Sequence, residues 1–253
     1  MIDIMDALRE QHQELLSIVT GLAEDQLALP SACEGWSVSD VLLHLAQTDE
    51  MAAASARGQS AGLAGGRANS SGVVRTDVND IVAGAVERER GASGHEVLAR
   101  WVKSADDMVD ALEACDPAAR VLWVAGDMAP RTLATTRLAE TWIHTGDVCI
   151  GLGIGQPKSD RIWHISRLVY RTLPYSSLRA GCELTGGVRF ELTSPTDQEA
   201  VWCFGEDNAE TVITGPAVDL CRVAGQRANA KETSLHGAGP DAETVLRIIR
   251  TFA

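Results

Sequence analysis

The sequence predicts an α plus α+β fold, with a four-helix bundle over residues 1–155 and a connecting helix with a small α+β domain over residues 156–253. Three observations lead to this prediction. The 253 residues are 45% hydrophobic, enough for the core of one large domain or of one ordinary and one small domain. Apolar residues recur at helical spacing up to about residue 155. From about residue 180, short apolar runs stand between Gly, Pro and Asp, as strands do.

The first part of the bundle contains two predicted helices. In residues 3–23, apolar side chains such as Leu8 and Leu15 recur near helical spacing with charges between them. The second helix, residues 38–56, begins after Ser37, and Asp40 stands at its third position, as in a capping box. Residues 57–75 are rich in Gly, Ser and Asn and predict a long loop.

The second part of the bundle continues with three helical segments. A helical pattern covers residues 77–90, and Ser93 with Glu96 forms a capping box for a helix that reaches Cys115. Pro130 suits the first turn of a long helix that ends at the glycines 151 and 153. Segments with polar outer faces and apolar inner faces predict a helical bundle.

The C-terminal part begins with a predicted helix over residues 160–173, before Pro174. Residues 188–195 and 199–205 then alternate or run apolar over short lengths and predict strands. Residues 211–227 predict a strand, a Gly-Pro turn and a helix, and residues 241–253 predict a terminal helix. These elements make up the small α+β domain.

The charge balance excludes two classes of partner. With 35 acidic and 22 basic residues, the formal net charge is -13, and the chain lacks the basic surface that nucleic acid or anionic lipid requires. No apolar run approaches the roughly 18 residues of a membrane helix. The beginning of the sequence is acidic and amphipathic, unlike a signal peptide, so we expect a cytoplasmic protein.

The six cysteines contain no C-x-x-C pair, so neither a zinc knuckle nor a compact disulfide framework is indicated. We expect reduced, mostly buried thiols. None has a neighbouring His or Lys in the sequence that would activate it, and there is no G-x-S-x-G motif. The chain therefore offers no evident covalent nucleophile of its own.

The strongest chemical pattern is the pair Glu140 and His144, four residues apart on the long predicted helix. Side chains at this spacing project from the same face and can bind one metal ion, although four such acid-histidine pairs occur in the chain. This helix is mostly apolar, and a buried carboxylate and imidazole need a partner. That partner would be a metal ion, Arg137 or a hydrogen bond between the two side chains. His44 lies in the apolar run VLLHLA and needs a partner for the same reason.

Two longer segments make this pattern more specific. GWSVSDVLLHLA and MAPRTLATTRLAETWIHTGDV resemble the metal-binding helices of the DinB-like superfamily, in the actinobacterial branch of mycothiol-dependent maleylpyruvate isomerase. WHISRLVYRTLP, FELTSP and ITGPAVDLCRVAGQR are similar to the C-terminal half of that branch. The resemblance covers nearly the whole chain and identifies the predicted bundle as DinB-like.

The resemblance implies a metal site and a thiol cosubstrate. In that family a His from the second helix, with a Glu and a His four apart on the fourth, binds a divalent ion. Here these residues are His44, Glu140 and His144. The ion is usually zinc, but nickel, iron or manganese also suits this ligand set. Three protein ligands leave one position open, which the family fills with mycothiol. The predicted substrate is a small anionic electrophile.

The reaction that the resemblance implies is addition of the metal-bound thiolate to the electrophile. It ends either in cis-trans isomerisation of the maleylpyruvate type or in thiol S-transfer, and the sequence does not separate the two. One alternative is a metal-bearing binding or resistance protein that sequesters a thiol conjugate or reactive metabolite without turnover. Another is a bundle with a vestigial site that serves as a dimerisation scaffold. The sequence leaves monomer and homodimer open.

Further candidates surround the predicted site. Asp147, one turn beyond His144, either orients its ring or is a charge at the helix end. Arg131 and Arg137 are candidates for holding an anionic substrate or enolate, or else form surface salt bridges. Where the family joins its two domains, four side chains are candidates for contacts with mycothiol: Arg167, Arg171, Gln226 and Arg227.

Overall fold

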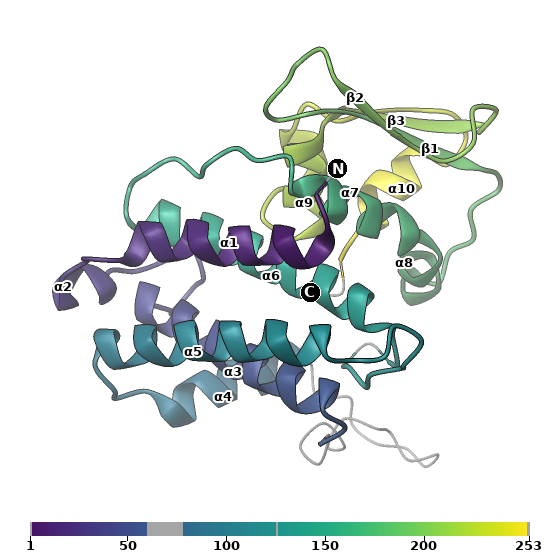
Figure 1. Cartoon of the computed structure of the whole chain (residues 1–253). Helices are drawn as coiled ribbons and strands as arrows, with labels where there is room; N and C mark the ends of the chain where they lie inside the picture. Colours follow the sequence, from purple (N-terminus) through teal and green to yellow (C-terminus); the bar gives the residue numbers. More distant parts are fainter. Residues whose placement is uncertain (1, 60–77, 125, 252–253) are drawn as a thin grey trace. The chain divides into compact units, whose positions relative to one another are not determined.

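The computed structural model describes residues 2–59, 78–124 and 126–251. Most of the predicted loop at residues 57–75 therefore lies outside the described residues. The chain divides into two compact units, Met1–Gln156 and Pro157–Ala253. The first is helical and the second combines helices with a small sheet (Figure 1), so the predicted fold class is confirmed.

The first unit is a bundle built on four long helices. These are α1 (Ile4–Val19), α3 (Val38–Ala56), α5 (Gly94–Glu113) and α6 (Pro130–Gly151), joined by α2 (Glu24–Leu27) and α4 (Val78–Glu89). Helix α1 packs against α6 and α5, and α3 packs against α5 and α6 (Figure 1). Each long helix therefore has one face in the bundle interior.

Local signals in the sequence set where the helices begin. The Ser37 hydroxyl accepts the Asp40 N–H at 3.1 Å, and the Asp40 carboxylate accepts the Ser37 N–H at 2.9 Å. Ser93 and Glu96 form the same reciprocal arrangement at the start of α5. Pro130 stands in the first turn of α6, where its missing N–H costs nothing. Both predicted capping boxes and the proline start are confirmed.

The bundle core joins α1, α3 and α5. Leu15, Leu42, Leu45 and Trp101 are at most 1% exposed, and the cluster also takes in Val148 from α6. Burial of such apolar surface stabilises the fold by roughly 25 cal/mol per Å². The core therefore fixes the side of α3 and of α6 that faces inward, and with it the polar residues on those faces.

The first helix is shorter than predicted. It ends at Val19, where the Thr20 N–H and hydroxyl both bond to the carbonyl of Leu16. Gly21 then has a φ of 81°, a left-handed conformation that glycine adopts without a steric penalty. This turn separates α1 from the short α2, so the predicted helix over residues 3–23 was too long.

The second unit contains a four-stranded mixed sheet in the order β2-β1-β3-β4. The strands are β1 (Val188–Thr193), β2 (Val201–Phe204), β3 (Thr211–Pro216) and β4 (His236–Ala238). Strand β1 is antiparallel to β2 and parallel to β3. Val188, Phe190 and Leu192 are buried while the alternate residues of β1 are half-buried, so one face of the sheet is covered by helices (Figure 1).

The helices of this unit are α7 (Ile162–Arg171), α8 (Leu173–Ala180), α9 (Ala217–Ala224) and α10 (Ala242–Ile248), with a short 3-10 turn at Ala230–Glu232. The single helix predicted before Pro174 is correct for α7. Pro174 then stands in the first turn of a second helix, α8, which the sequence analysis did not predict.

Two other expectations in this unit differ from the structure. Gly215 and Pro216 form no separate turn, because α9 begins directly after β3. A side chain at Gly215 would meet the Ser234 carbonyl at 2.6 Å, so this position needs glycine for close strand approach. His236 begins the edge strand β4, which was not predicted from the sequence.

Within the described ranges, no helix combines the length and the apolar character needed to cross a membrane.

Candidate functional site

The bundle brings together three side chains that lie far apart in the sequence. His44 from α3 and Glu140 and His144 from α6 form a group that we call the His/Glu/His cluster. Nε2 of His44 lies 3.5 Å from Oε2 of Glu140, and Nε2 of His144 lies 3.7 Å from the same oxygen. The two imidazole rings are 4.8 Å apart between centroids. All three side chains are at most 14% exposed, so the cluster is almost closed to water.

Helical spacing and the contact between α3 and α6 explain this arrangement. Glu140 and His144 are one turn apart on the buried face of α6, and their side chains point the same way. His44 stands among buried leucines on the inner face of α3. Because α3 packs on α6, the three polar groups meet in the bundle interior.

Burial and neighbouring charges set the protonation states. Burial lowers the pKa of His44 to about 4, against the opposing effect of Glu140. Burial acts to raise the pKa of Glu140, but His44, and then His144 and Arg137, bring this pKa down to about 2. Near neutral pH, His44 is therefore uncharged and Glu140 is ionised, which are the states in which both groups bind a cation.

The cluster has the geometry and donor set of a metal site. Neither carboxylate-imidazole separation falls within the 2.7–3.2 Å of an ordinary N–H···O bond. Two ligands at 2.0–2.1 Å from one tetrahedral zinc ion would lie about 3.3 Å apart. Nδ1 of His44 also lacks a hydrogen-bond partner among the described residues. The three residues therefore fit a divalent ion better than they fit a hydrogen-bonded core cluster.

His144 has further polar contacts through its other ring nitrogen. Its Nδ1 lies 2.9 Å from Oδ2 of Asp147, which is 1% exposed, so Asp147 is not a surface charge. The Sγ atom of Cys33 lies 3.1 Å from the same oxygen and 3.7 Å from Nδ1 of His144. The centroids of the Trp36 and His44 rings are 5.3 Å apart. The sequence analysis did not single out Cys33, because no local pattern places it beside α6.

Arg137 is buried one turn before Glu140. Its Nε donates to Oδ1 of Asp49 at 3.0 Å and its Nη2 donates to the Thr48 hydroxyl at 2.8 Å. Arg137 is 1% exposed and Asp49 is fully buried, so this is an internal ion pair and not a surface salt bridge. Asp49 is another residue that the sequence analysis missed, because an acid in an amphipathic helix gives no sign of its burial.

Arg131 lies apart from the cluster. It pairs with Asp3 on the bundle surface, where the Arg131 side chain is 56% exposed. Glu140 is nine residue steps after Arg131, which corresponds to roughly 13 Å along α6 at 1.5 Å per residue. The structure therefore does not bring Arg131 to the His/Glu/His cluster.

The four candidates for thiol contacts belong to the second unit, and all are exposed. The guanidinium of Arg167 lies 5.9 Å from the centre of the Trp163 ring. Arg171 lines a surface hollow of about 670 Å³ beside α8. Gln226 has a φ of 59°, and Nη1 of Arg227 donates to the Gly225 carbonyl at 3.1 Å. Gln226 and Arg227 thus share one turn after α9.

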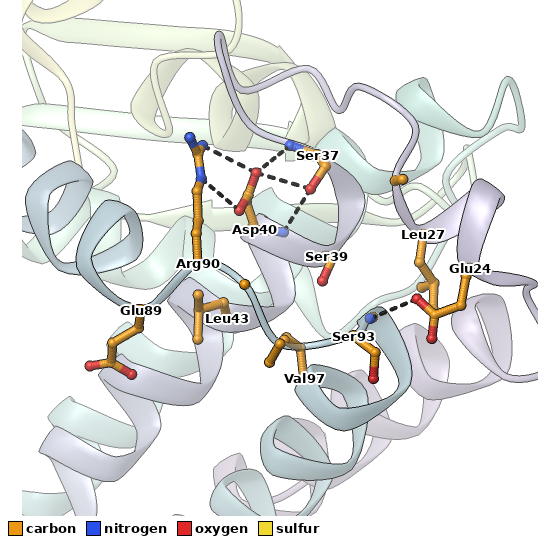
Figure 2. A pocket seen from close by; sticks show the side chains of 14 residues that line it. Glu24, Leu27, Ser37, Ser39, Asp40, Leu43, Glu89, Arg90, Ser93 and Val97 are labelled. Carbon is orange, nitrogen blue, oxygen red and sulfur yellow. Dashed lines mark hydrogen bonds and ion pairs between the residues drawn. The ribbon is translucent and has the colours of Figure 1, made fainter.

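Another hollow, of about 310 Å³, lies where α3 and α5 begin (Figure 2). Its lining residues form contacts with one another: Asp40 accepts from Arg90 and from the Ser37 hydroxyl, and Glu24 accepts the Gly94 N–H at 2.8 Å. These contacts hold the helix starts. We therefore assign this hollow a structural role.

The fold and the site together define a class of protein: a helical bundle with a buried His/Glu/His set, continued by a small α/β unit. Residues 8–149 match the family model of the mycothiol maleylpyruvate isomerase N-terminal domain. The chain therefore belongs to this family.

Comparison with individual proteins agrees with this assignment. Two uncharacterized proteins of Mycobacterium tuberculosis, from strains CDC 1551 and H37Rv, are each 28% identical to it, over 97% of this chain and 93% of theirs. The crystal structure of the mycothiol-dependent maleylpyruvate isomerase has a similar fold, with a TM-score of 0.58 and 17% identity. A histidine-to-alanine mutant of that enzyme gives a TM-score of 0.59 and 15% identity. Both structures match 94% of this chain and 95% of their own.

Proposed function

We propose that this protein is a metal-dependent cytoplasmic enzyme that uses mycothiol and adds its thiolate to a small electrophilic substrate. The reaction would be a cis-trans isomerisation of the maleylpyruvate type or a thiol S-transfer. The observation that carries the proposal is the convergence of His44, Glu140 and His144 on one buried point, within the part of the chain that matches the family.

The three residues of the cluster would hold the ion. His44 offers a neutral nitrogen, Glu140 an ionised oxygen, and His144 the nitrogen that faces Glu140. Zinc is the first candidate, and nickel, iron or manganese also suits two nitrogens and one oxygen. A divalent ion with a free coordination position lowers the pKa of a bound thiol, so that it is a thiolate at neutral pH. Asp147 would hold the His144 ring in the ligating orientation.

Three of the six cysteines are poorly suited to act as the nucleophile, which supports an external one. Burial raises the pKa of Cys149 to about 11 and, against a smaller effect of Ser166, that of Cys221 to about 12. Burial also raises the pKa of Cys115. These thiols are protonated at neutral pH and are therefore poor nucleophiles. A low-molecular-weight thiol would supply the reacting sulfur.

The positive charge of Arg137, one turn before Glu140, contributes to the lowered pKa of Glu140. Because the Arg137 guanidinium binds Asp49 and Thr48, we assign it an electrostatic role toward an anionic substrate or enolate. Arg131 is a weaker candidate, since it pairs with Asp3 at the surface. For the carboxylate and hydroxyl groups of mycothiol we propose the side chains of the second unit: Arg167, Arg171, Gln226 and Arg227.

Metal analysis of the purified protein, followed by addition of mycothiol, tests the proposal. We expect one divalent ion per chain, lost in His44→Ala and His144→Ala and kept in His236→Ala, an exposed histidine of β4. In the cobalt-substituted protein, mycothiol should produce a sulfur-to-cobalt charge-transfer band. A spectrum that saturating mycothiol leaves unchanged would refute the thiol cosubstrate.

Mass spectrometry of products then separates the reactions. An activated cis-enoate that leaves as its trans isomer, with mycothiol regenerated, indicates isomerisation. A stable mycothiol adduct indicates S-transfer. Tight binding of the electrophile with no product would instead favour the binding or resistance protein that sequesters it.

A further inference from the structure

The segment between α2 and α3 forms an ordered turn over residues 30–37, which we call the Cys33 turn. The Ser31 N–H and hydroxyl both donate to the Trp36 carbonyl at 2.9 Å. The Cys33 N–H donates to the Ser31 hydroxyl at 3.1 Å, and Pro30 and Ser37 form an isolated antiparallel bridge. These bonds fix the backbone of the turn, so the direction of the Cys33 side chain is defined.

The turn contacts the two helices that carry the His/Glu/His cluster. On α6, the Asp147 carbonyl accepts the Ala32 N–H at 3.1 Å. The Cys33 thiol donates to Oδ2 of Asp147, also at 3.1 Å. On α3, the Trp36 ring packs at 5.3 Å from His44. One short segment therefore contacts both Asp147, the partner of His144, and His44 itself.

Oδ2 of Asp147 receives two donors, the thiol of Cys33 and the Nδ1–H of His144. Asp147 is 1% exposed, so water does not readily replace a lost donor. A carboxylate fixed by two donors from different segments has less rotational freedom than one fixed by a single donor. The orientation of Asp147 in turn determines the tautomer and ring direction of His144, with Nε2 toward Glu140.

We propose that Cys33 is a positioning residue of the metal site: its thiol holds Asp147 in place and thereby directs His144 toward the ion. The inference rests on the proposed function, because it takes His144 as a metal ligand. It assigns Cys33 no catalytic or nucleophilic role. The Cys33 side chain is long enough to contact Asp147 and carries one weak donor, the S–H group. Alanine has neither property, and serine keeps both in part.

Metal affinity is the direct measure of this role. Apparent affinity for Co²⁺ is measured by competition with a chromophoric chelator in the wild type and in the Cys33→Ala, Cys33→Ser and Asp147→Asn variants. Loss of an outer-shell partner typically lowers metal affinity 10- to 100-fold, and we expect a loss in this range for Asp147→Asn. For Cys33→Ala, one step further from the ion, we expect roughly 3- to 10-fold, with Cys33→Ser nearer the wild type.

A matched control separates positioning from general packing. Cys115→Ala removes another half-buried thiol, one that donates to the backbone carbonyls of Ala56 at the end of α3 and Ala111 in α5, and should leave the affinity unchanged. In the Asp147→Asn background, Cys33→Ala should cause no further loss, because its effect passes through Asp147. Far-UV circular dichroism checks that each variant folds. If Cys33→Ala does not fold, the comparison of Cys33→Ser with the wild type still tests the role of the thiol.

The outcomes distinguish this inference from the proposed function. If the wild type binds no divalent ion, the metal site itself is refuted. If it binds one and Asp147→Asn weakens binding while Cys33→Ala behaves like Cys115→Ala, the role of Cys33 is refuted and the metal site stands. Full additivity of the two losses would also refute it.

One other arrangement uses the same atoms. Cys33, His144 and Asp147 could themselves hold a cation, since their donor atoms lie within 4.8 Å of one another. A second equivalent of Co²⁺, with a charge-transfer band in the absence of added thiol that Cys33→Ser abolishes, would reveal such a site. That result would overturn the positioning role.

Discussion

The buried ion pair of Arg137 and Asp49 gives the sharpest test of how the bundle interior is built. Arg137 is 1% exposed, and its bonds go to Asp49 and to the hydroxyl of Thr48. Asp49→Ala would leave a buried guanidinium without its counterion. Removing one partner of a buried pair costs about 3–5 kcal/mol of folding free energy. For a chain of this size, that corresponds to a fall in Tm of roughly 6–20 °C.

The raised pKa of Asp49 leads to the opposite prediction when both members of the pair are replaced together. Burial raises this pKa to about 6, although Arg137 opposes the shift. Burial, together with the charges of Glu140 and Glu50, therefore affects the protonation of Asp49 more strongly than Arg137 does, and we expect the pair to add little net stability. We expect the double variant Asp49→Leu/Arg137→Met to be clearly more stable than Asp49→Ala, because a well-packed apolar pair avoids the desolvation.

Urea unfolding at pH 7, followed by far-UV circular dichroism, measures both effects. Asp107→Ala is the matched control, since it removes a carboxylate from an exposed ion pair with Arg57, and it should change the midpoint little. If Asp49→Ala loses no more stability than Asp107→Ala, the buried charge is tolerated and the reasoning is wrong. A double variant less stable than Asp49→Ala would refute the desolvation argument.

Three further predictions follow from the site and its surroundings. Glu140→Gln should lower metal content while far-UV circular dichroism stays unchanged, because the cluster loses its negative ligand; full occupancy by metal analysis would contradict the assignment. Burial, then the charges of Arg137 and Arg9, lower the pKa of His12 to about 3, below its ordinary 6.5. The unfolded chain thus binds one more proton between these values, and stability from this group is present above pH 6.5 and lost as the pH falls toward 3. His12→Gln should reduce the pH dependence of the free energy of unfolding by up to about 1.4 kcal/mol per pH unit in that window, measured by urea midpoints at several pH values. Replacing the cysteines other than Cys33 should leave turnover of an activated enoate largely intact, and omitting the low-molecular-weight thiol should abolish it; thiol-independent turnover would exclude the mechanism.

Much of the fold could be read from local sequence. The starts of α3 and α5 were predicted correctly because Ser37 with Asp40, and Ser93 with Glu96, interact within a single turn. The change from helices to strands was also predicted correctly, because the spacing of apolar residues along the sequence changes there. Predictions failed where a distant contact decides the outcome. The edge strand that begins at His236 exists because it pairs with β3, and its own sequence gives no strand pattern.

For the candidate site, too, local sequence predicted some features and distant contacts decided the others. The sequence by itself determined that Glu140 and His144 share a helix face, since their spacing is a property of the helix, and the family resemblance added His44. Only the tertiary structure decided that Cys33 reaches Asp147. Only the tertiary structure buried Asp49 against Arg137. The reason is physical: helical spacing and capping act over a few residues, whereas burial and the partner of a polar group depend on which distant segments the core packs together.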